Sequence, residues 1–186
     1  MNQYKLLEVL DSDTLDKVYN IFGLENVYNF TNQIIAIKYS FDKFTYSDIL
    51  KNIIGLNLRQ WTMTSSRFID LIEFSVDKNF TIGKIDFLEF VDNSIIEVIN
   101  NNIVKLNQTK DITLKHQIKN RIINDLEWIT LAECIDIQSI PLICESDLPP
   151  FIVEGRFFNN GVLYIDDESS LDILKNFFIH YYQKGV

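Results

Sequence analysis

Glycine is scarce in this chain, and its scarcity bears on nucleotide binding. Only six of the 186 residues are glycine. Phosphate-binding loops place several glycines close together, because the backbone must approach the phosphate oxygens closely. Neither a glycine-rich dinucleotide motif nor a P-loop occurs in the sequence. We therefore expect no nucleotide to be bound through either of these common loops.

Histidine and cysteine are also scarce, which bears on metal binding and catalysis. His116 and His180 each lack a second histidine three or four residues away, the spacing of a metal-binding helix. Cys134 and Cys144 form no CxxC pair and are too few for a disulfide framework, so we expect two buried, reduced thiols. The GxSxG nucleophile motif is missing too. The sequence thus predicts a protein that is not an enzyme and holds no cofactor or metal.

Long apolar runs are missing as well. The first residues lack the basic start and apolar stretch of a signal peptide, since Glu8 and Asp11 interrupt them early. No run approaches the roughly 20 apolar residues that a membrane-spanning helix needs. We expect a cytoplasmic protein without a membrane partner.

Basic residues are outnumbered by acidic ones, 17 against 26, for a formal net charge of −9. Such a field repels a phosphate backbone, so we expect no nucleic-acid partner. The one basic concentration, over 105–121, is interpreted as the solvated face of an amphipathic helix. An acidic surface instead favours a basic protein partner.

The residues that are present suffice for a folded core. Hydrophobic residues make up 47% and charged residues 23%, as in globular proteins, and the length fits one domain. We predict a single α+β domain over residues 1–186, with an antiparallel β-meander and hairpins packed against about four helices. The oligomeric state stays open.

Apolar residues recur at helical spacing in four segments, and each segment begins near a capping residue. The most regular stripe consists of Ile118, Ile122, Leu126 and Ile129. The predicted helices are Ser12–Phe22, Thr45–Ile54, Asp111–Ile135 and Glu168–Tyr182.

The middle of the chain predicts strands. Residues Leu71–Asp77 alternate apolar and polar side chains with a period of two, and the β-rich segments Phe80–Val91 and Ile95–Ile99 follow after turn residues. This pattern indicates an antiparallel meander. The alternative is a helix over Lys84–Leu106, whose apolar density is high enough.

Strands are also predicted on either side of this segment. Two lie between Asn26 and Ser40, and Phe151–Ile165 is a hairpin in which Asn160-Gly161 supplies both positive φ angles of a type I′ turn. Pro141 and Pro149-Pro150 indicate an irregular stretch before the hairpin. The predicted core comprises Ile35, Ile37, Ile53, Ile72, Phe74, Ile118, Ile122, Leu126, Phe157 or Phe158, Leu174 and Phe178.

Asp166, Asp167 and Glu168 form the densest acidic cluster, directly before a predicted helix. We predict a partner-binding surface here, with Tyr164 as its aromatic anchor, because acidic residues outnumber basic ones from Asp136 onward and a lopsided field orients a basic partner. The alternative is structural: carboxylates at a helix start are favoured by the helix dipole.

These observations lead to one functional hypothesis and two alternatives. The hypothesis is an immunity-type inhibitor that neutralises a basic toxin or nuclease domain by surface binding, by analogy with a class rather than through a motif. One alternative is an enzyme that uses the carboxylates of Asp166, Asp167 and Glu168 with Mg²⁺. The other is a phage or mobile-element protein that blocks a host defence nuclease.

Overall fold

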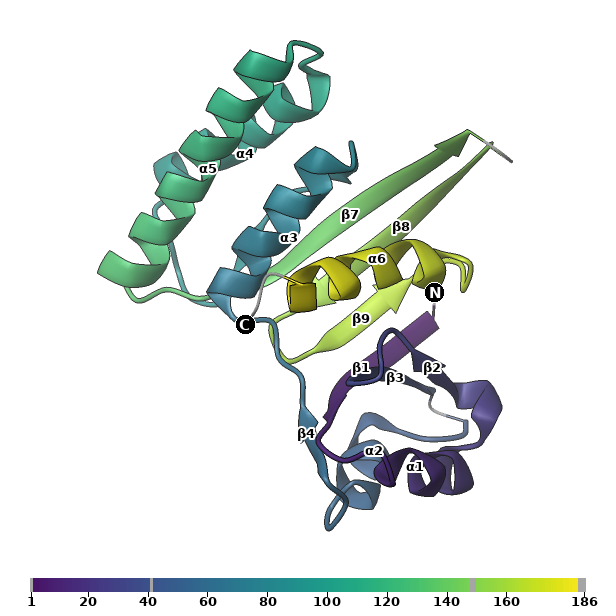
Figure 1. Cartoon of the computed structure of the whole chain (residues 1–186). Coiled ribbons are helices and arrows are strands. Elements are labelled where there is room, and N and C mark those ends of the chain that lie inside the picture. The colour runs from purple at the N-terminus through teal and green to yellow at the C-terminus, as the bar shows by residue number, and fades with distance from the viewer. Residues whose placement is uncertain (1, 41, 148–149, 184–186) are drawn as a thin grey trace. The chain divides into compact units, whose positions relative to one another are not determined.

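The computed structural model describes residues 2–40, 42–147 and 150–183 and divides into two compact units. Unit 1 comprises residues 1–62 and 160–186, and unit 2 comprises residues 63–159. Both combine helices with antiparallel strands, so the predicted α+β class is confirmed (Figure 1). The described residues form six α-helices, where about four were predicted.

Unit 1 is built around the first strand. Its strands are β1 (Asn2–Val9), β2 (Val27–Asn29), β3 (Ile34–Tyr39), β4 (Leu58–Gln60) and β9 (Val162–Ile165), and its helices are α1 (Thr14–Phe22), α2 (Tyr46–Asn52) and α6 (Ser170–Gln183). Along one side β1 pairs with β3, which carries β2 at its outer edge. Along the other side it pairs with β9 over its first half and with β4 over its second half.

The sheet of unit 1 has an apolar core on each face. On one face, Leu7 of β1 and Ile35 and Ile37 of β3 pack with Phe22 of α1 and Ile49 of α2. Successive residues of a strand point to opposite faces, so the neighbouring positions of β1 and β3 face the other way.

Aromatic side chains fill the second face. Phe178 of α6 stacks on Phe30 with ring centroids 4.2 Å apart, and the ring centroid of Trp61 lies 5.2 Å from that of Phe178. The central position of β1 explains why both of its faces are apolar.

Unit 2 joins a long strand pair to three helices. Its strands are β5 (Thr81–Ile82), β6 (Asp86–Phe87), β7 (Ile137–Asp147) and β8 (Pro150–Phe158), and its helices are α3 (Ser65–Asp77), α4 (Asn93–Gln108) and α5 (Ile112–Ala132). Strand β7 pairs with β8 on one side and with β5 and β6 on the other. Helix α5 contacts both α3 and α4.

The predicted meander in the middle of the chain is wrong, because Leu71–Asp77 belongs to α3 and Ile95–Ile99 belongs to α4. Thr64 caps α3, and nearly all sides of the second half of this helix are buried. Burial on many sides places apolar residues at both helical and alternate positions, so the period of two was ambiguous. The alternative, a helix over Lys84–Leu106, is nearer to what is observed, because α4 spans Asn93–Gln108. The segment Phe80–Val91 does contain strands, the short β5 and β6.

The stretch around Pro141 is not irregular but lies inside β7. Pro141 sits between the points where β6 and β5 pair with β7, and its carbonyl accepts a hydrogen bond from the Gly83 N–H at 2.8 Å. A proline lacks only the backbone donor, so it is tolerated where no neighbouring strand needs that donor. Pro149 falls outside the described residues.

Of the remaining local predictions, some are confirmed and others are wrong. All four predicted helices are present with ends shifted by up to three residues, and every predicted core residue is buried, Phe157 more fully than Phe158. Gly161 has a φ of 72°, whereas Asn160 is not among the residues with positive φ, so the predicted type I′ turn is wrong.

Cys144 is buried as expected, but Cys134 is exposed. Among the described residues, no helix is both long and apolar enough to cross a membrane.

Candidate functional site

The predicted anchor Tyr164 lies in β9, in one row with two other polar side chains. Gln3 of β1 is the cross-strand partner of Tyr164 on one side and of Tyr39 on the other. Directly opposed residues of antiparallel strands point to the same face of the sheet. Tyr164, Gln3 and Tyr39 therefore share the face that α1 and α2 cover.

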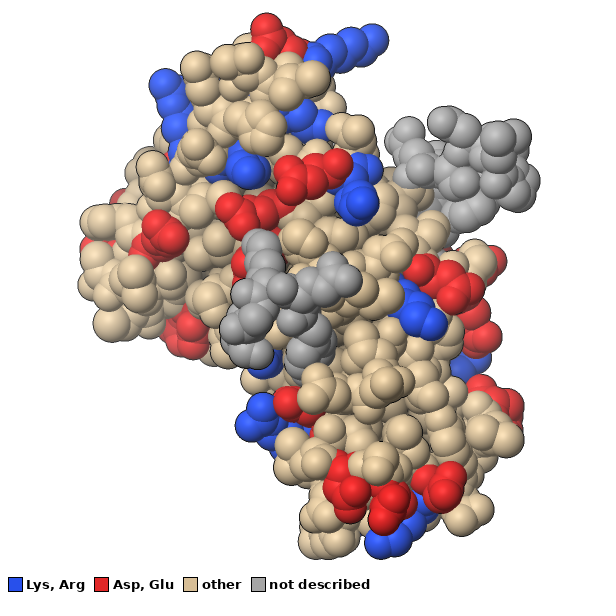
Figure 2. Space-filling view, viewed as in Figure 1, with Lys and Arg blue, Asp and Glu red and all other residues tan. Residues whose placement is uncertain are grey.

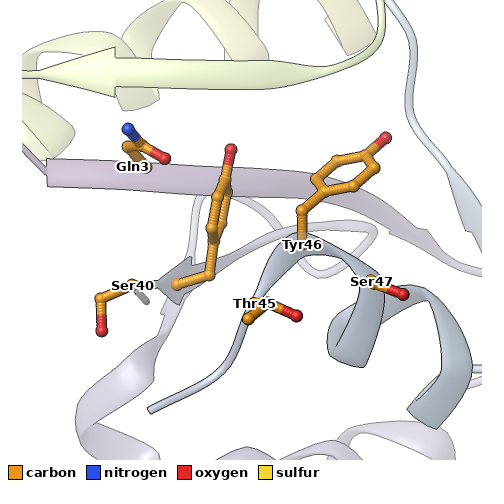
Figure 3. Close-up of a pocket in the computed structure, with 6 residues that line it drawn as sticks. Gln3, Ser40, Thr45, Tyr46 and Ser47 are labelled. Atoms are coloured by element: carbon orange, nitrogen blue, oxygen red, sulfur yellow. The ribbon is translucent and has the colours of Figure 1, made fainter. Parts of the chain in front are cut away.

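A pocket of about 320 Å³ opens beside this row. The described residues that line it are Gln3, Tyr39, Ser40, Thr45, Tyr46 and Ser47. Figure 3 shows Gln3 rising from β1 and Tyr46 from the start of α2, with their polar tips on the same side of the pocket. The rings of Tyr39 and Tyr46 meet edge to face, with centroids 5.9 Å apart.

The start of α2 holds Tyr46 in place. Thr45 and Asp48 form a reciprocal capping box, in which the Asp48 N–H donates to Thr45 Oγ1 at 3.2 Å and the Thr45 N–H donates to Asp48 Oδ2 at 3.0 Å. These bonds satisfy two of the free N–H groups at the start of the helix. The backbone that carries Tyr46 is thus fixed at the rim of the pocket.

The phenols of the pocket stay protonated over the physiological range. Burial, then the neighbouring Tyr164 and Tyr46, raises the pKa of Tyr39 to about 12. Burial also raises the pKa of Tyr46. The pocket therefore presents neutral hydroxyl groups that donate or accept hydrogen bonds, on otherwise apolar rings.

A fully buried lysine lies behind Tyr46. The Nζ atom of Lys5 donates to the carbonyl of Asn160 and sits 5.6 Å from the centroid of the Tyr46 ring. No carboxylate of the described residues forms an ion pair with it. Burial lowers the pKa of Lys5 to about 8, since a desolvated ammonium is disfavoured.

The three predicted carboxylates follow β9, and two of them have partners within the chain. Asp167 accepts a hydrogen bond from the Ser169 N–H at 2.8 Å, which lowers the pKa of its carboxyl group. Glu168 pairs with Lys38 and accepts a hydrogen bond from Tyr4, and its pKa is lowered chiefly by Lys38. Asp166 is exposed.

The sheet separates Tyr164 from Glu168. Tyr4 and Lys38 are cross-strand partners on β1 and β3, one position along from the row of Gln3. They therefore point to the face opposite Tyr164, and the Glu168 carboxylate joins them there. Tyr164 and the Glu168 carboxylate thus lie on opposite faces, which a sequence-based cluster of neighbours could not reveal.

The pocket residues and Lys5 were not predicted as functional. They come from β1, from the end of β3 and from the start of α2, so no short motif unites them. One signal was available in the sequence: Lys5 interrupts the otherwise apolar run of Tyr4, Leu6 and Leu7. A lysine within an otherwise apolar strand indicates either that the strand lies at the edge of its sheet or that the lysine is buried with a specific role.

Two further findings bear on function. Within the described ranges, no group of three or more His, Cys, Asp or Glu residues could hold a metal ion. The chain matches no protein-family model, no curated protein and no solved structure.

Proposed function

We propose that this chain is a protein-binding inhibitor that neutralises a basic partner, with the tyrosine pocket and Tyr164 as its anchor site. The observation that carries the proposal is a partly open, neutral, aromatic pocket on a chain with a net charge of −9. Interfaces derive most of their affinity from a few aromatic contacts in water-excluding pockets, and charge steers the encounter.

The pocket suits one uncharged side chain of the partner. A volume of about 320 Å³ admits an aromatic or branched aliphatic group, and the Tyr39 and Tyr46 rings offer it two faces. A cationic side chain is disfavoured inside, because the Lys5 ammonium already lies 5.6 Å from the Tyr46 centroid. The basic residues of the partner are then expected over the exposed carboxylates outside the pocket, of which Asp166 is one.

The structural roles of Asp167 and Glu168 decide how the acidic part of this surface is tested. Asp167 stabilises the turn before α6, and Glu168 holds Lys38 and Tyr4. Reversing either charge would disturb the fold as well as any interface. Asp166 is exposed and is the position of the three at which a charge reversal reports on binding.

The experiment captures the partner with the intact chain, purifies it and measures binding kinetics with variants. We expect Tyr46→Ala to raise the dissociation rate at least about tenfold, as for loss of an aromatic hot spot. Asp166→Lys should mainly slow association at low salt. The matched controls are Tyr19→Ala on α1 and Asp77→Lys on α3, which lie outside the pocket.

Two results would overturn the proposal. One is a captured partner that binds the Tyr46→Ala variant and the Tyr19→Ala control equally well. The other is an intact chain that binds its partner without reducing the partner's activity, since the inhibitory role then fails while the binding site stands.

A further inference from the structure

Helix α5 of unit 2 carries its charges against its own dipole. Residues 110–121 include four basic side chains and one acidic side chain, whereas 122–136 include four acidic side chains and no basic one. Acidic groups stabilise the N-terminus of a helix and basic groups its C-terminus. Apart from the capping Asp111, α5 has no acidic residue in its first turn and no basic residue in its last. The arrangement costs helix stability.

The acidic end of α5 is also where apolar side chains reach the solvent. Leu131 is 79% exposed and Trp128 is 50% exposed, although both are large apolar residues. Leu131 also lines a groove of about 380 Å³, together with Ile69 and with Thr64, Ser65, Ser66, Glu127, Thr130 and Asp136, and Trp128 follows the lining residue Glu127 in the chain. The two walls of this groove are the start of α3 and the end of α5.

Carboxylates surround this groove. Glu127 and Asp136 line it, and the side chain of Ser65 donates to Asp136 Oδ1 at 3.0 Å. The Asp136 N–H donates to Glu89 Oε2 at 3.2 Å, which brings a third carboxylate to the same place. Among the residues that the structure describes, no basic side chain lines the groove. Figure 2 shows red atoms at the left edge of the molecule, where Figure 1 places the end of α5.

The other end of the same helix shows that exposure alone does not select this groove. Ile112 is 73% exposed and Leu114 is also exposed, but they are flanked by Lys110 and Lys115. The free N–H groups of the helix add positive potential there, whereas the free carbonyls add negative potential at the C-terminal end. Charge thus distinguishes two apolar surfaces that are otherwise similar.

We propose that the groove between α3 and α5 docks a basic amphipathic helix of a protein partner. Its apolar face would pack on Ile69, Leu131 and Trp128, as in other helix-in-groove complexes. Its lysine or arginine side chains would pair with Glu127, Glu133 and Asp136 and with the C-terminal carbonyls of α5. The inference rests on the proposed function only for the basic character of the partner, since the groove lies in unit 2 and the tyrosine pocket in unit 1.

The test titrates the intact chain with a synthetic amphipathic peptide of leucine and lysine, about five helical turns long. Fluorescence reports binding, because Trp128 is half exposed while the other tryptophan, Trp61, is fully buried. We expect a saturable blue shift that is lost in Trp128→Phe. The double variant Glu127→Lys with Glu133→Lys should weaken binding at least about tenfold, and Leu131→Ser should do the same.

The matched control alters the opposite end of α5. Ile112→Ser should leave the peptide affinity unchanged, as should reversal of an exposed carboxylate remote from the groove in Asp77→Lys. A peptide with glutamate in place of lysine should not bind. Far-ultraviolet circular dichroism shows that each variant is folded.

Three outcomes would overturn the inference: no saturable shift, equal weakening by Ile112→Ser and Leu131→Ser, or equal binding of the acidic peptide. Tyr46→Ala separates this test from that of the proposed function. That variant should bind the peptide normally while losing the captured partner. If the peptide fails to bind while the intact chain still captures its partner, the docking proposal for the groove is overturned and the proposed function stands.

Discussion

At the scale of single residues, the chain places one cation where none is expected. Lys5 is fully buried in the central strand of unit 1, and its hydrogen bond to the Asn160 carbonyl ties the turn before β9 to β1. The ring of Tyr46 covers it at 5.6 Å. Gly161, the residue after Asn160, lies so close to the carbonyl of Trp61 that it leaves no room for a side chain. The two residues together explain how the row of Gln3 and Tyr164 is held beside the pocket.

Lys5 predicts a pH dependence of stability. Its pKa is about 8 when folded and near the ordinary 10.5 when unfolded, so the unfolded chain binds more protons between these values. The free energy of unfolding should therefore rise with pH across this window, by roughly 1–2 kcal/mol between pH 8 and 9.5 relative to Lys5→Met. Denaturant titrations of both proteins measure the difference. Tyrosine titration affects both alike, and an exposed control, Lys78→Met, should leave the slope unchanged.

Gly161 predicts a large effect of a single methyl group. A Cβ atom at Gly161 would lie 1.8 Å from the carbonyl oxygen of Trp61, and the φ of 72° is strained for other residues. Gly161→Ala should destabilise the chain by roughly 2 kcal/mol or more. Gly55 has a similar φ of 84° but open space around it, so Gly55→Ala should cost only about 1 kcal/mol. Equal melting temperatures for the two variants would contradict the close approach at Gly161.

At the scale of elements, α5 combines a well-packed face with an unpartnered one. Ile118, Ile122, Leu126 and Ile129 are buried, as the periodicity predicted, and α5 contacts both α3 and α4. The opposite side ends in Leu131 and an acidic C-terminus. After the helix ends, the Ile135 N–H donates to the Ile129 carbonyl at 3.3 Å. Cys134, just before it, has a positive φ of 54°.

The two faces of α5 should respond differently to the same substitution. Leu126→Ala is expected to destabilise the protein by about 2–5 kcal/mol, because it leaves a cavity in addition to losing burial. Leu131→Ala on the exposed side should change stability by no more than about 0.5 kcal/mol. Chemical denaturation of the two variants measures both values. A small loss for Leu126→Ala would show that the stripe is not core.

The reversed charges of α5 predict that its acidic end can be stabilised. Glu133 is the C-terminal cap residue and is exposed. Glu133→Lys should raise stability by a few tenths of a kcal/mol, because a cation meets the negative end of the helix dipole. The gain should shrink in high salt. Gln117→Lys, near the N-terminal end of the same helix, serves as the control for added charge, and an equal gain there would contradict the dipole argument.

At the scale of the whole molecule, the chain leaves unit 1 after residue 62 and returns to it at residue 160. The Met63 N–H donates to the Asn159 carbonyl at 3.0 Å, which joins the two ends of unit 2. Strand β9 and helix α6 follow unit 2 in the chain, yet they complete the sheet and core of unit 1. Unit 1 therefore forms fully only when the ends of unit 2 are brought together.

This connectivity predicts cooperative unfolding of a single domain. Trp61 lies in unit 1, whereas helices α3, α4 and α5 of unit 2 contribute much of the circular dichroism signal. In a Trp128→Phe variant, the fluorescence of Trp61 and the helical signal should change at the same denaturant concentration. Separate midpoints would indicate two independently folding units.

The sequence by itself determined the local structure wherever one physical signal dominated. The four predicted helices follow from hydrophobic periodicity, because each has a buried face that repeats at the helical period. The two strands predicted between Asn26 and Ser40 follow from apolar segments separated by polar turn residues, and β3 is buried on both faces. The signal failed for α3, whose residues are buried on several sides, and for β7, where Pro141 is tolerated by a gap between neighbouring strands.

Only the tertiary structure decided the candidate sites. Tyr164 and Glu168 are four residues apart, yet they lie on opposite faces of the sheet, because the Glu168 carboxylate contacts Lys38 and Tyr4 on the face away from Tyr164. Gln3, Tyr39 and Tyr46 are far apart in the sequence, yet strand pairing and the cap of α2 bring them to one pocket. Residue type determines what a side chain can do, whereas strand register and helix packing determine which side chains meet.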